Sequence, residues 1–188
     1  RIARRKRIDD GDRFGGIAGG RHVRTLDSKP AEPSGSYDNI DKEKKDLEKA
    51  ALPVGVGVQR GSWDLRYDGA RAIKGGKLDA GSPREGPLAV PGTYLARLTV
   101  SGQSFESKIT VAPDPRRVVS PADLQAQLTL SLKVRDDVSR LTDMVDSVRS
   151  IRGQLQERVE TLKDNPKAAD LVKNAKTLVT RLDALENQ

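Results

Sequence analysis

The stretch from Trp63 to Val111 decides the fold: Trp63-Asp64-Leu65-Arg66-Tyr67 opens it, and Pro91-Gly92-Thr93-Tyr94 leads into its last two runs. Apolar and polar residues alternate over 94–100 and again over 105–111, on either side of Ser101-Gly102-Gln103. A period of two is typical of strands with one buried face, and a short glycine turn between two such runs predicts a β-hairpin. The large residues at inward positions predict the core: Trp63, Leu65, Tyr67, Tyr94, Leu98, Phe105 and Ile109.

Downstream of Val111 the pattern changes from strand to helix. Ala112-Pro113-Asp114-Pro115 ends the strand, because proline has no N–H for a ladder and disfavours helix in the residue before it. Ser120-Pro121-Ala122-Asp123 then combines an N-cap serine, a proline at the first helical position and an early carboxylate. We therefore expect one helix over about 121–163, a break at Asp164-Asn165-Pro166, and a second helix over about 167–187.

Both helices carry aliphatic residues at spacings of three and four, with Arg152 as the one position of the first seam that is not apolar. Such seams are too apolar to face water, so the two helices are predicted to fold back as an antiparallel hairpin. The predicted hairpin interface consists of Val134, Val138, Leu141, Val145, Val148, Leu155, Val159, Leu171, Leu178 and Leu182.

Upstream of the β-stretch the chain is less regular. Residues 1–21 form a basic, glycine-rich arm in which no regular strand is predicted. The β-domain is expected over 22–115, beginning with the short strand candidate 22–26 and interrupted by a charged insertion at 27–60. The helical hairpin takes the rest, 116–188. The predicted fold class is α+β in separate parts.

Positive charge is concentrated in the first residues. The net charge is +7, residues 1–24 hold eight lysines and arginines against three aspartates, and the charges from Ser120 onward balance. Arg4-Arg5-Lys6-Arg7 could contact phosphates, because clustered cations release counterions on binding a polyanion. We interpret the run as a solvated arm, or as a segment separated from the strands it pairs with, so nucleic acid is not the expected partner.

No pattern for catalysis, metal binding or a cofactor is found in the sequence. The chain has no cysteine, and its single histidine, His22, has no sequence pattern that would make it a ligand or a base. The glycines at 15–20 are not followed by the Gly-Lys-Ser/Thr of a phosphate loop. Neighbouring carboxylates such as Asp136 and Asp137 point about 100° apart on a helix and do not flank a bond. No run of eighteen apolar residues predicts a membrane span.

The order of the motifs resembles a known arrangement. Trp63-Asp64-Leu65-Arg66-Tyr67, then Pro91-Gly92-Thr93-Tyr94, then Ser120-Pro121-Ala122-Asp123-Leu124 resemble the C-terminal region of bacterial sortilin-like, BNR-repeat proteins, often labelled glycosyl hydrolases. The resemblance extends over roughly 20–26 and 60–163, and Val23-Arg24-Thr25-Leu26 is similar to an early strand of that region. It implies a small immunoglobulin-like β-sandwich followed by a long antiparallel helical hairpin, downstream of a β-propeller.

The resemblance also implies the function. We expect a non-catalytic accessory module that packs on or orients a propeller of the same or another protein, with an exported location and any hydrolase activity residing in the propeller. A homodimer through the helices is a further expectation. Two other functions stay open at this point: polyanion binding through the basic arm, and carbohydrate binding at the 69–90 loop, which lacks the aromatic residues such binding needs.

Overall fold

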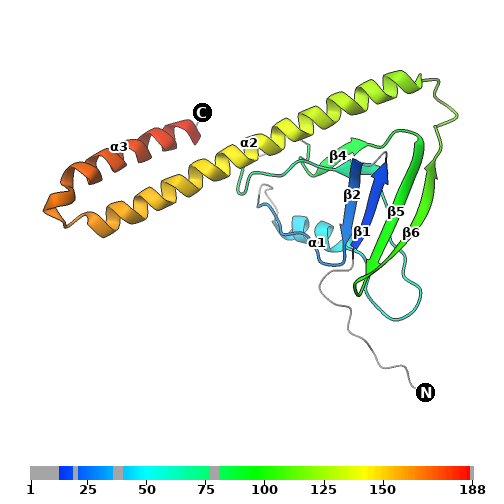
Figure 1. The fold of residues 1–188 in the computed structure, drawn as a ribbon, viewed down its shortest axis with the longest axis horizontal. Coiled ribbons are helices and arrows are strands. Elements are labelled where there is room, and N and C mark those ends of the chain that lie inside the picture. The colour runs from blue at the N-terminus through cyan, green and yellow to red at the C-terminus, as the bar shows by residue number, and fades with distance from the viewer. Residues whose placement is uncertain (1–12, 19–20, 36–39, 77–80, 187–188) are drawn as a thin grey trace, which may run out of the picture. The chain divides into compact units, whose positions relative to one another are not determined.

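The structure is a computed structural model that describes residues 13–18, 21–35, 40–76 and 81–186. It is an α+β protein with two small antiparallel sheets, a helix of 42 residues and a C-terminal helix (Figure 1). The chain divides into two compact units, Arg1–Asp137 and Val138–Gln188.

The larger sheet has four strands in the order β2-β1-β5-β6. These strands are β1 (Arg13–Ala18), β2 (Arg21–Asp27), β5 (Gly92–Val100) and β6 (Gln103–Val111). The predicted hairpin forms as β5 and β6, which pair residue by residue from Gly92↔Val111 to Val100↔Gln103. Its turn places both Ser101 and Gly102 at positive φ, 49° and 79°, as a two-residue primed turn requires.

Strand β1 differs from the sequence prediction, which placed residues 1–21 in an irregular arm. Residues 13–18 lie between β2 and β5 and pair with both. The strand is stabilised by two long-range ladders rather than by its own residues, which include two glycines and show no alternation. The basic run at 4–7 lies outside the described residues.

The smaller sheet pairs β3 (Arg66–Asp68) with β4 (Glu85–Leu88). The strand predicted from Trp63 begins only at Arg66. The Asp64 carboxylate accepts a hydrogen bond from the Arg66 amide at 3.1 Å, and Leu65 has a φ of 58°. A left-handed residue breaks the extended conformation, so the alternation of Trp63, Leu65 and Tyr67 does not correspond to one strand face.

The core of the first unit joins both sheets to the beginning of helix α2 (Pro121–Leu162). It consists of Val23, Tyr67, Tyr94, Leu128 and Leu132, with Trp63, Ala89, Val90 and Val111 packed against it. Trp63 meets Tyr94 edge to face with ring centroids 5.3 Å apart. The sequence placed the domain boundary at 115/116, but the compact unit extends to Asp137 because Leu128 and Leu132 belong to this core.

The predicted core residues have different positions in the structure. Tyr67 and Tyr94 are buried and Trp63 is half-buried, whereas Leu65, Leu98, Phe105 and Ile109 are 41%, 40%, 58% and 37% exposed. Leu65 is displaced by its left-handed backbone. The other three lie on the same face of the β5–β6 hairpin as Tyr94 and Ala96. Residues 52–63 cover Leu98 and Ile109 only in part, and Phe105 pairs with Leu98 on the outer strand near the turn.

The second unit contains the rest of α2, a short 3₁₀ turn (Pro166–Ala168) and α3 (Ala169–Glu186). The helix break lies where Asp164-Asn165-Pro166 predicts it, and the Asn165 side chain caps the turn by accepting a hydrogen bond from the Lys167 amide at 3.0 Å. No residue of α3 is buried, and Thr142 is the one buried residue among the described part of this unit.

Candidate functional site

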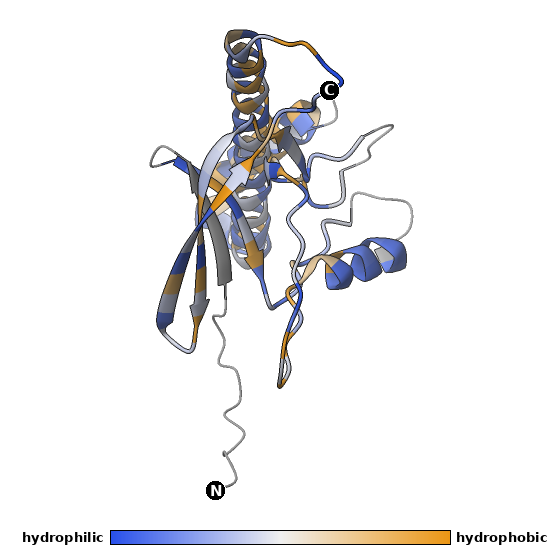
Figure 2. Cartoon of the chain, turned by 90° about the vertical axis from the view of Figure 1, so that its right-hand side faces the viewer, coloured by the Kyte–Doolittle hydropathy of each residue, from blue (hydrophilic) through white to orange (hydrophobic). Residues whose placement is uncertain are grey.

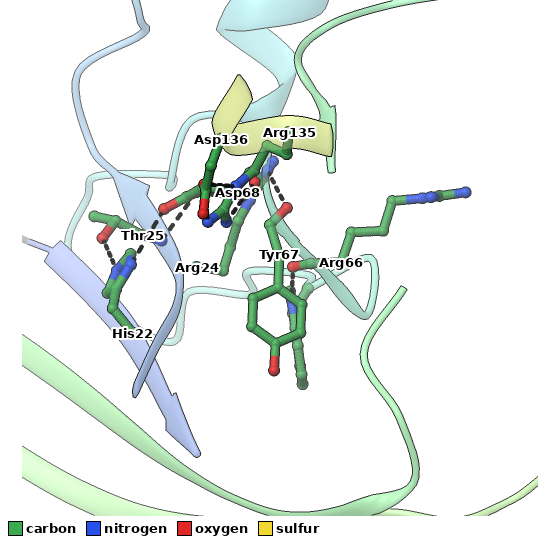
Figure 3. A network of polar contacts seen from close by, with 9 residues as sticks. His22, Arg24, Thr25, Arg66, Tyr67, Asp68, Arg135 and Asp136 are labelled. Atoms are coloured by element: carbon green, nitrogen blue, oxygen red, sulfur yellow. Dashed lines mark hydrogen bonds and ion pairs between the residues drawn. The ribbon is translucent and has the colours of Figure 1, made fainter. Parts of the chain in front are cut away.

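A network of polar side chains joins β2 and β3 at Asp68 (Figure 3). The carboxylate of Asp68 accepts a hydrogen bond from the Thr25 amide at 3.4 Å. It also lies 3.5 Å from His22 Nδ1 and 3.7 Å from Arg24 Nε. Arg24 Nη1 also donates to the carbonyl of Tyr67 at 3.3 Å. These contacts cover the β2 edge of the large sheet with the small one.

Two further arginines donate to backbone carbonyls near this network, and Figure 3 shows one of them, Arg135, beside Asp68 and Asp136. Arg135 of α2 donates from Nη1 to the Asp68 carbonyl at 3.3 Å, and its Nε and Nη2 bind the Asp136 carboxylate at 2.8 and 2.6 Å. Arg66 donates to the Gly86 carbonyl at 2.9 Å and pairs with Glu85 at 2.7 Å. The arginines therefore connect α2, β3 and β4, which is a structural task.

One part of this network has the connectivity of a catalytic triad: a hydroxyl, an imidazole and a carboxylate that would orient the imidazole. His22 Nε2 lies 2.8 Å from Thr25 Oγ1, while His22 Nδ1 faces Asp68. Three features argue against acyl transfer. The Nδ1 to carboxylate distance of 3.5 Å is long, the His22 side chain is 55% exposed, and the Thr25 amide donates to Asp68 instead of to a developing oxyanion. We interpret the group as a surface clasp between two strands.

Helix α1 (Ile40–Ala50) is anchored by a buried carboxylate. The helix is almost entirely hydrophilic (Figure 2), yet Glu43 is only 7% exposed. It accepts hydrogen bonds from the amide and hydroxyl of Ser34 at 2.7 and 2.8 Å and from the Gly35 amide at 3.2 Å. Burial alone would raise the pKa of Glu43, but these hydrogen bonds and the nearby Arg84 outweigh it and lower the pKa.

Two cavities of about 290 and about 530 Å³ lie beside α1 and share Arg24 and Arg84 in their walls. The Nε atoms of both arginines are buried without a hydrogen-bond partner in the described structure. Each guanidinium nevertheless has a carboxylate close by, Asp68 at 3.7 Å for Arg24 and Glu43 at 3.5 Å for Arg84. Lys29 and Lys42 leave each cavity wall with one net positive charge, but both arginines, the groups suited to hold an anion, already face a carboxylate of the protein.

An apolar groove of about 400 Å³ runs along the exposed end of the large sheet. Its walls are Leu26, Leu52, Pro53, Gln59, Gly61, Trp63, Leu98 and Ile109. The groove contains no ionisable side chain, so it offers contact area rather than chemistry. Burial raises the pKa of Tyr94, next to this region, but its hydroxyl donates to the Val90 carbonyl at 2.5 Å and is not available as an acid.

The helical unit exposes two aliphatic rows. Leu171, Leu178 and Leu185 follow one another at intervals of seven on α3 and are 61%, 43% and 62% exposed. On α2 the row of Leu141, Met144 and Ile151 is 53%, 61% and 48% exposed. Ordinary protein surfaces expose hydrophobic residues one at a time, whereas these residues recur along one side of a helix.

The predicted hairpin interface is divided between these rows and the inner face of the helices. Val145, Val148, Leu155, Val159 and Leu182 are half-buried, while Val134, Val138, Leu141, Leu171 and Leu178 are exposed. The rotation of α3 explains the difference. Ion pairs from Arg149 and Arg152 to Asp183 and Glu186 bring the row of Val172, Ala175 and Val179 inward, one position away from the predicted leucines.

Sequence reasoning missed the charged part of this site. Arg152 was predicted only as an interruption of the seam, yet it binds Asp183 and Glu186 at 3.0 and 2.7 Å. Its position within an aliphatic seam is the signal that could have revealed an acidic partner on the other helix. Leu128 and Leu132 were also missed as core residues, although their spacing of four is visible before the predicted seam begins.

The described residues hold no cluster of three or more side chains suited to a metal ion. Among the same residues, no helix combines the length and apolar character needed to cross a bilayer. A scan against protein-family models, a search of curated proteins and a search of solved structures each give no match.

Proposed function

We propose that this chain is a non-catalytic interaction module, in which an immunoglobulin-like β-domain and a helical hairpin dock on a β-propeller of the sortilin-like, BNR-repeat type. One observation carries the proposal: the exposed leucine row of α3, Leu171, Leu178 and Leu185. A helix that buries none of its residues gains little stability from packing, so a second surface is needed to cover the leucines.

The chemistry of the rows specifies the partner's surface. Between the leucines of α3 lie exposed acidic, basic and neutral polar residues, such as Asp170, Lys173 and Asn174. Such a surface favours an aliphatic partner with a mixed polar rim over a polyanion. The propeller is the partner that the motif order supports, from Trp63-Asp64-Leu65-Arg66-Tyr67 to Ser120-Pro121-Ala122-Asp123.

Calorimetric titration of the whole chain against a β-propeller domain of this type tests the proposal. We expect saturable binding that is lost in a variant combining Leu171→Ser, Leu178→Ser and Leu185→Ser. The matched control combines Asn174→Ser, Thr177→Ser and Arg181→Ser, which are exposed positions of the same helix, and should bind like the unchanged chain. Absent binding, or equal binding by both variants, would refute the proposal.

Salt dependence distinguishes the alternatives. Contact between aliphatic rows should change little between about 50 and 500 mM salt, whereas polyanion binding through 4–7 should fall by orders of magnitude. For carbohydrate binding, residues 69–76 and 81–90 supply no aromatic side chain on which a sugar ring could stack. We therefore place both alternatives below the interaction module.

A further inference from the structure

Strand β6 forms a long uncovered edge of the large sheet. It pairs with β5 through nine consecutive positions without a bulge, and no other described strand pairs with it. All seven residues from Ser104 to Thr110 are exposed, and none of them is proline. The opposite edge, β2, is covered by the contacts of Asp68. A regular edge of this length is a template for pairing with another strand.

We propose that β6 pairs antiparallel with β6 of a second copy of this chain, about a two-fold axis at Ser107, so that the two four-stranded sheets become one. Phe105 is 58% exposed and Ile109 is 37% exposed. Pairing about Ser107 places Phe105 of each copy opposite Ile109 of the other, which covers both apolar side chains.

Charge complementarity supports the same axis. Glu106 binds Arg97 of β5 at 2.7 Å, whereas Lys108 has no ion pair within the described structure. About Ser107, Lys108 of each copy comes to lie opposite Glu106 of the other. In each copy, Arg97 of β5 pairs with Glu106 of β6, and this Glu106 lies opposite Lys108 of the second copy. Positive and negative charges therefore alternate across the three strands.

The direction of the backbone groups restricts the register. Ser101 and Gly102 form a two-residue turn, so Val100 and Gln103 are a hydrogen-bonded pair and odd-numbered residues of β6 direct their N–H and C=O groups to β5. Even-numbered residues direct theirs to the free edge. A two-fold antiparallel pair must therefore join even to even positions, which places the axis at a residue. The axes that pair the most residues of β6 lie at Glu106, Ser107 and Lys108.

Only one of these three axes is electrostatically favourable. An axis at Glu106 places two glutamates opposite each other, and an axis at Lys108 does the same with two lysines. Like charges directly opposite each other destabilise a strand pair. The axis at Ser107 is the one that pairs opposite charges and apolar side chains together.

A cysteine scan tests this register, because the chain contains no cysteine of its own. At the Ser107 axis the two equivalent residues form a non-hydrogen-bonded pair with Cα atoms about 4.5 Å apart, within the range of a disulfide. Ser107→Cys should therefore give a disulfide-linked dimer of the full chain under mild oxidation. In the matched control, Ser104→Cys, the two cysteines would lie about 20 Å apart, so this variant should form no disulfide-linked dimer.

Sedimentation of the unchanged chain completes the experiment. Between about 10 and about 500 µM, the range expected for a small interface, the mass should rise from 20.5 kDa toward twice that value. Lys108→Glu should weaken this association at least tenfold. A constant monomer mass together with no disulfide in Ser107→Cys would overturn the proposal, and so would equal cross-linking of the Ser104→Cys control.

The experiment is independent of the propeller. The variant that combines Leu171→Ser, Leu178→Ser and Leu185→Ser should cross-link through Ser107→Cys like the unchanged helices, because these leucines lie outside the strand. Loss of cross-linking in that variant would assign the dimer to the helices instead of β6. Failure of propeller binding and failure of β6 pairing are therefore separate results.

Discussion

Arg152 on α2 donates to Glu186 on α3 across 2.7 Å, although 34 positions separate the two residues. Arg149 reaches the same carboxylate at 2.6 Å. Hydrogen bonding by Arg149 is the main cause that lowers the pKa of Glu186, and Arg152 adds to it. Because the inward row of α3 is only half-buried, this charged cluster and the turn at 163–168 contribute to holding α3 on α2.

Replacing Arg152 should therefore loosen α3 without unfolding the first unit. In Arg152→Ala we expect amide exchange across Ala169–Glu186 to accelerate several-fold, while exchange in β5 and β6 stays unchanged. Hydrogen exchange read by mass spectrometry of peptides measures this. Arg158→Ala is the control, since that exposed arginine has no ion pair in the described structure. Equal acceleration in both variants would mean that the ion pairs do not hold α3.

Leu128 should behave as a core residue even though it lies on the long helix. It is 5% exposed and packs with Tyr67 and Tyr94, so Leu128→Ala should lower the free energy of unfolding by about 2–5 kcal/mol. Leu130→Ala, two positions away and 64% exposed, should change it by less than about 0.5 kcal/mol. Urea unfolding followed by Trp63 fluorescence checks both, because Trp63 packs against this core.

Local patterns predicted the β5–β6 hairpin and the helix ends, because alternation, a primed turn and capping residues each act within a few positions. The rest depends on distant partners. Strand β1 has no alternation of its own and exists through β2 and β5. Leu128 and Leu132 look like any helical stripe until Val23 and Tyr94 are beside them.

The exposed apolar rows of the helices, like the fold, were predictable only in part. Aliphatic spacing showed that the helices carry more apolar residues than one seam can bury, but α3 offers two adjacent rows. Which row faces inward is decided by Asp183 and Glu186 meeting Arg149 and Arg152. That choice is a tertiary contact, so the sequence alone placed Leu171 and Leu178 in the seam.

Two glycines should respond to alanine with opposite signs. A Cβ on Gly86 would come within 1.9 Å of the Tyr67 carbonyl oxygen, so Gly86→Ala must separate β3 from β4 and should destabilise the first unit by several kcal/mol. A Cβ on Gly153 meets nothing within 4 Å on a helix, and Gly153→Ala should stabilise by about 0.5–1 kcal/mol. Thermal unfolding of each variant measures the two signs. A neutral Gly86→Ala would show that β3 and β4 do not approach this closely.

The stability that Glu43 provides should depend on pH in a defined direction. Its pKa in the folded chain lies below the ordinary value, so the unfolded state binds the proton more readily. The contribution is therefore complete above the unfolded pKa of about 4.3 and is lost as the pH falls through the lower folded pKa. Glu43→Gln, which keeps the shape but removes the charge, should cost about 1–2 kcal/mol near neutral pH.

The measurement compares urea unfolding of the unchanged chain and Glu43→Gln between about pH 7 and pH 3, a range that spans the unfolded pKa of a glutamate. The difference between the two should shrink as the pH falls, because the glutamate becomes neutral like the glutamine. Glu48→Gln, an exposed position on the same helix, should show no such convergence. A difference that stays constant down to pH 3 would place the role of Glu43 in its shape rather than in its charge, and would remove the ionic anchor of α1 on Ser34 and Gly35.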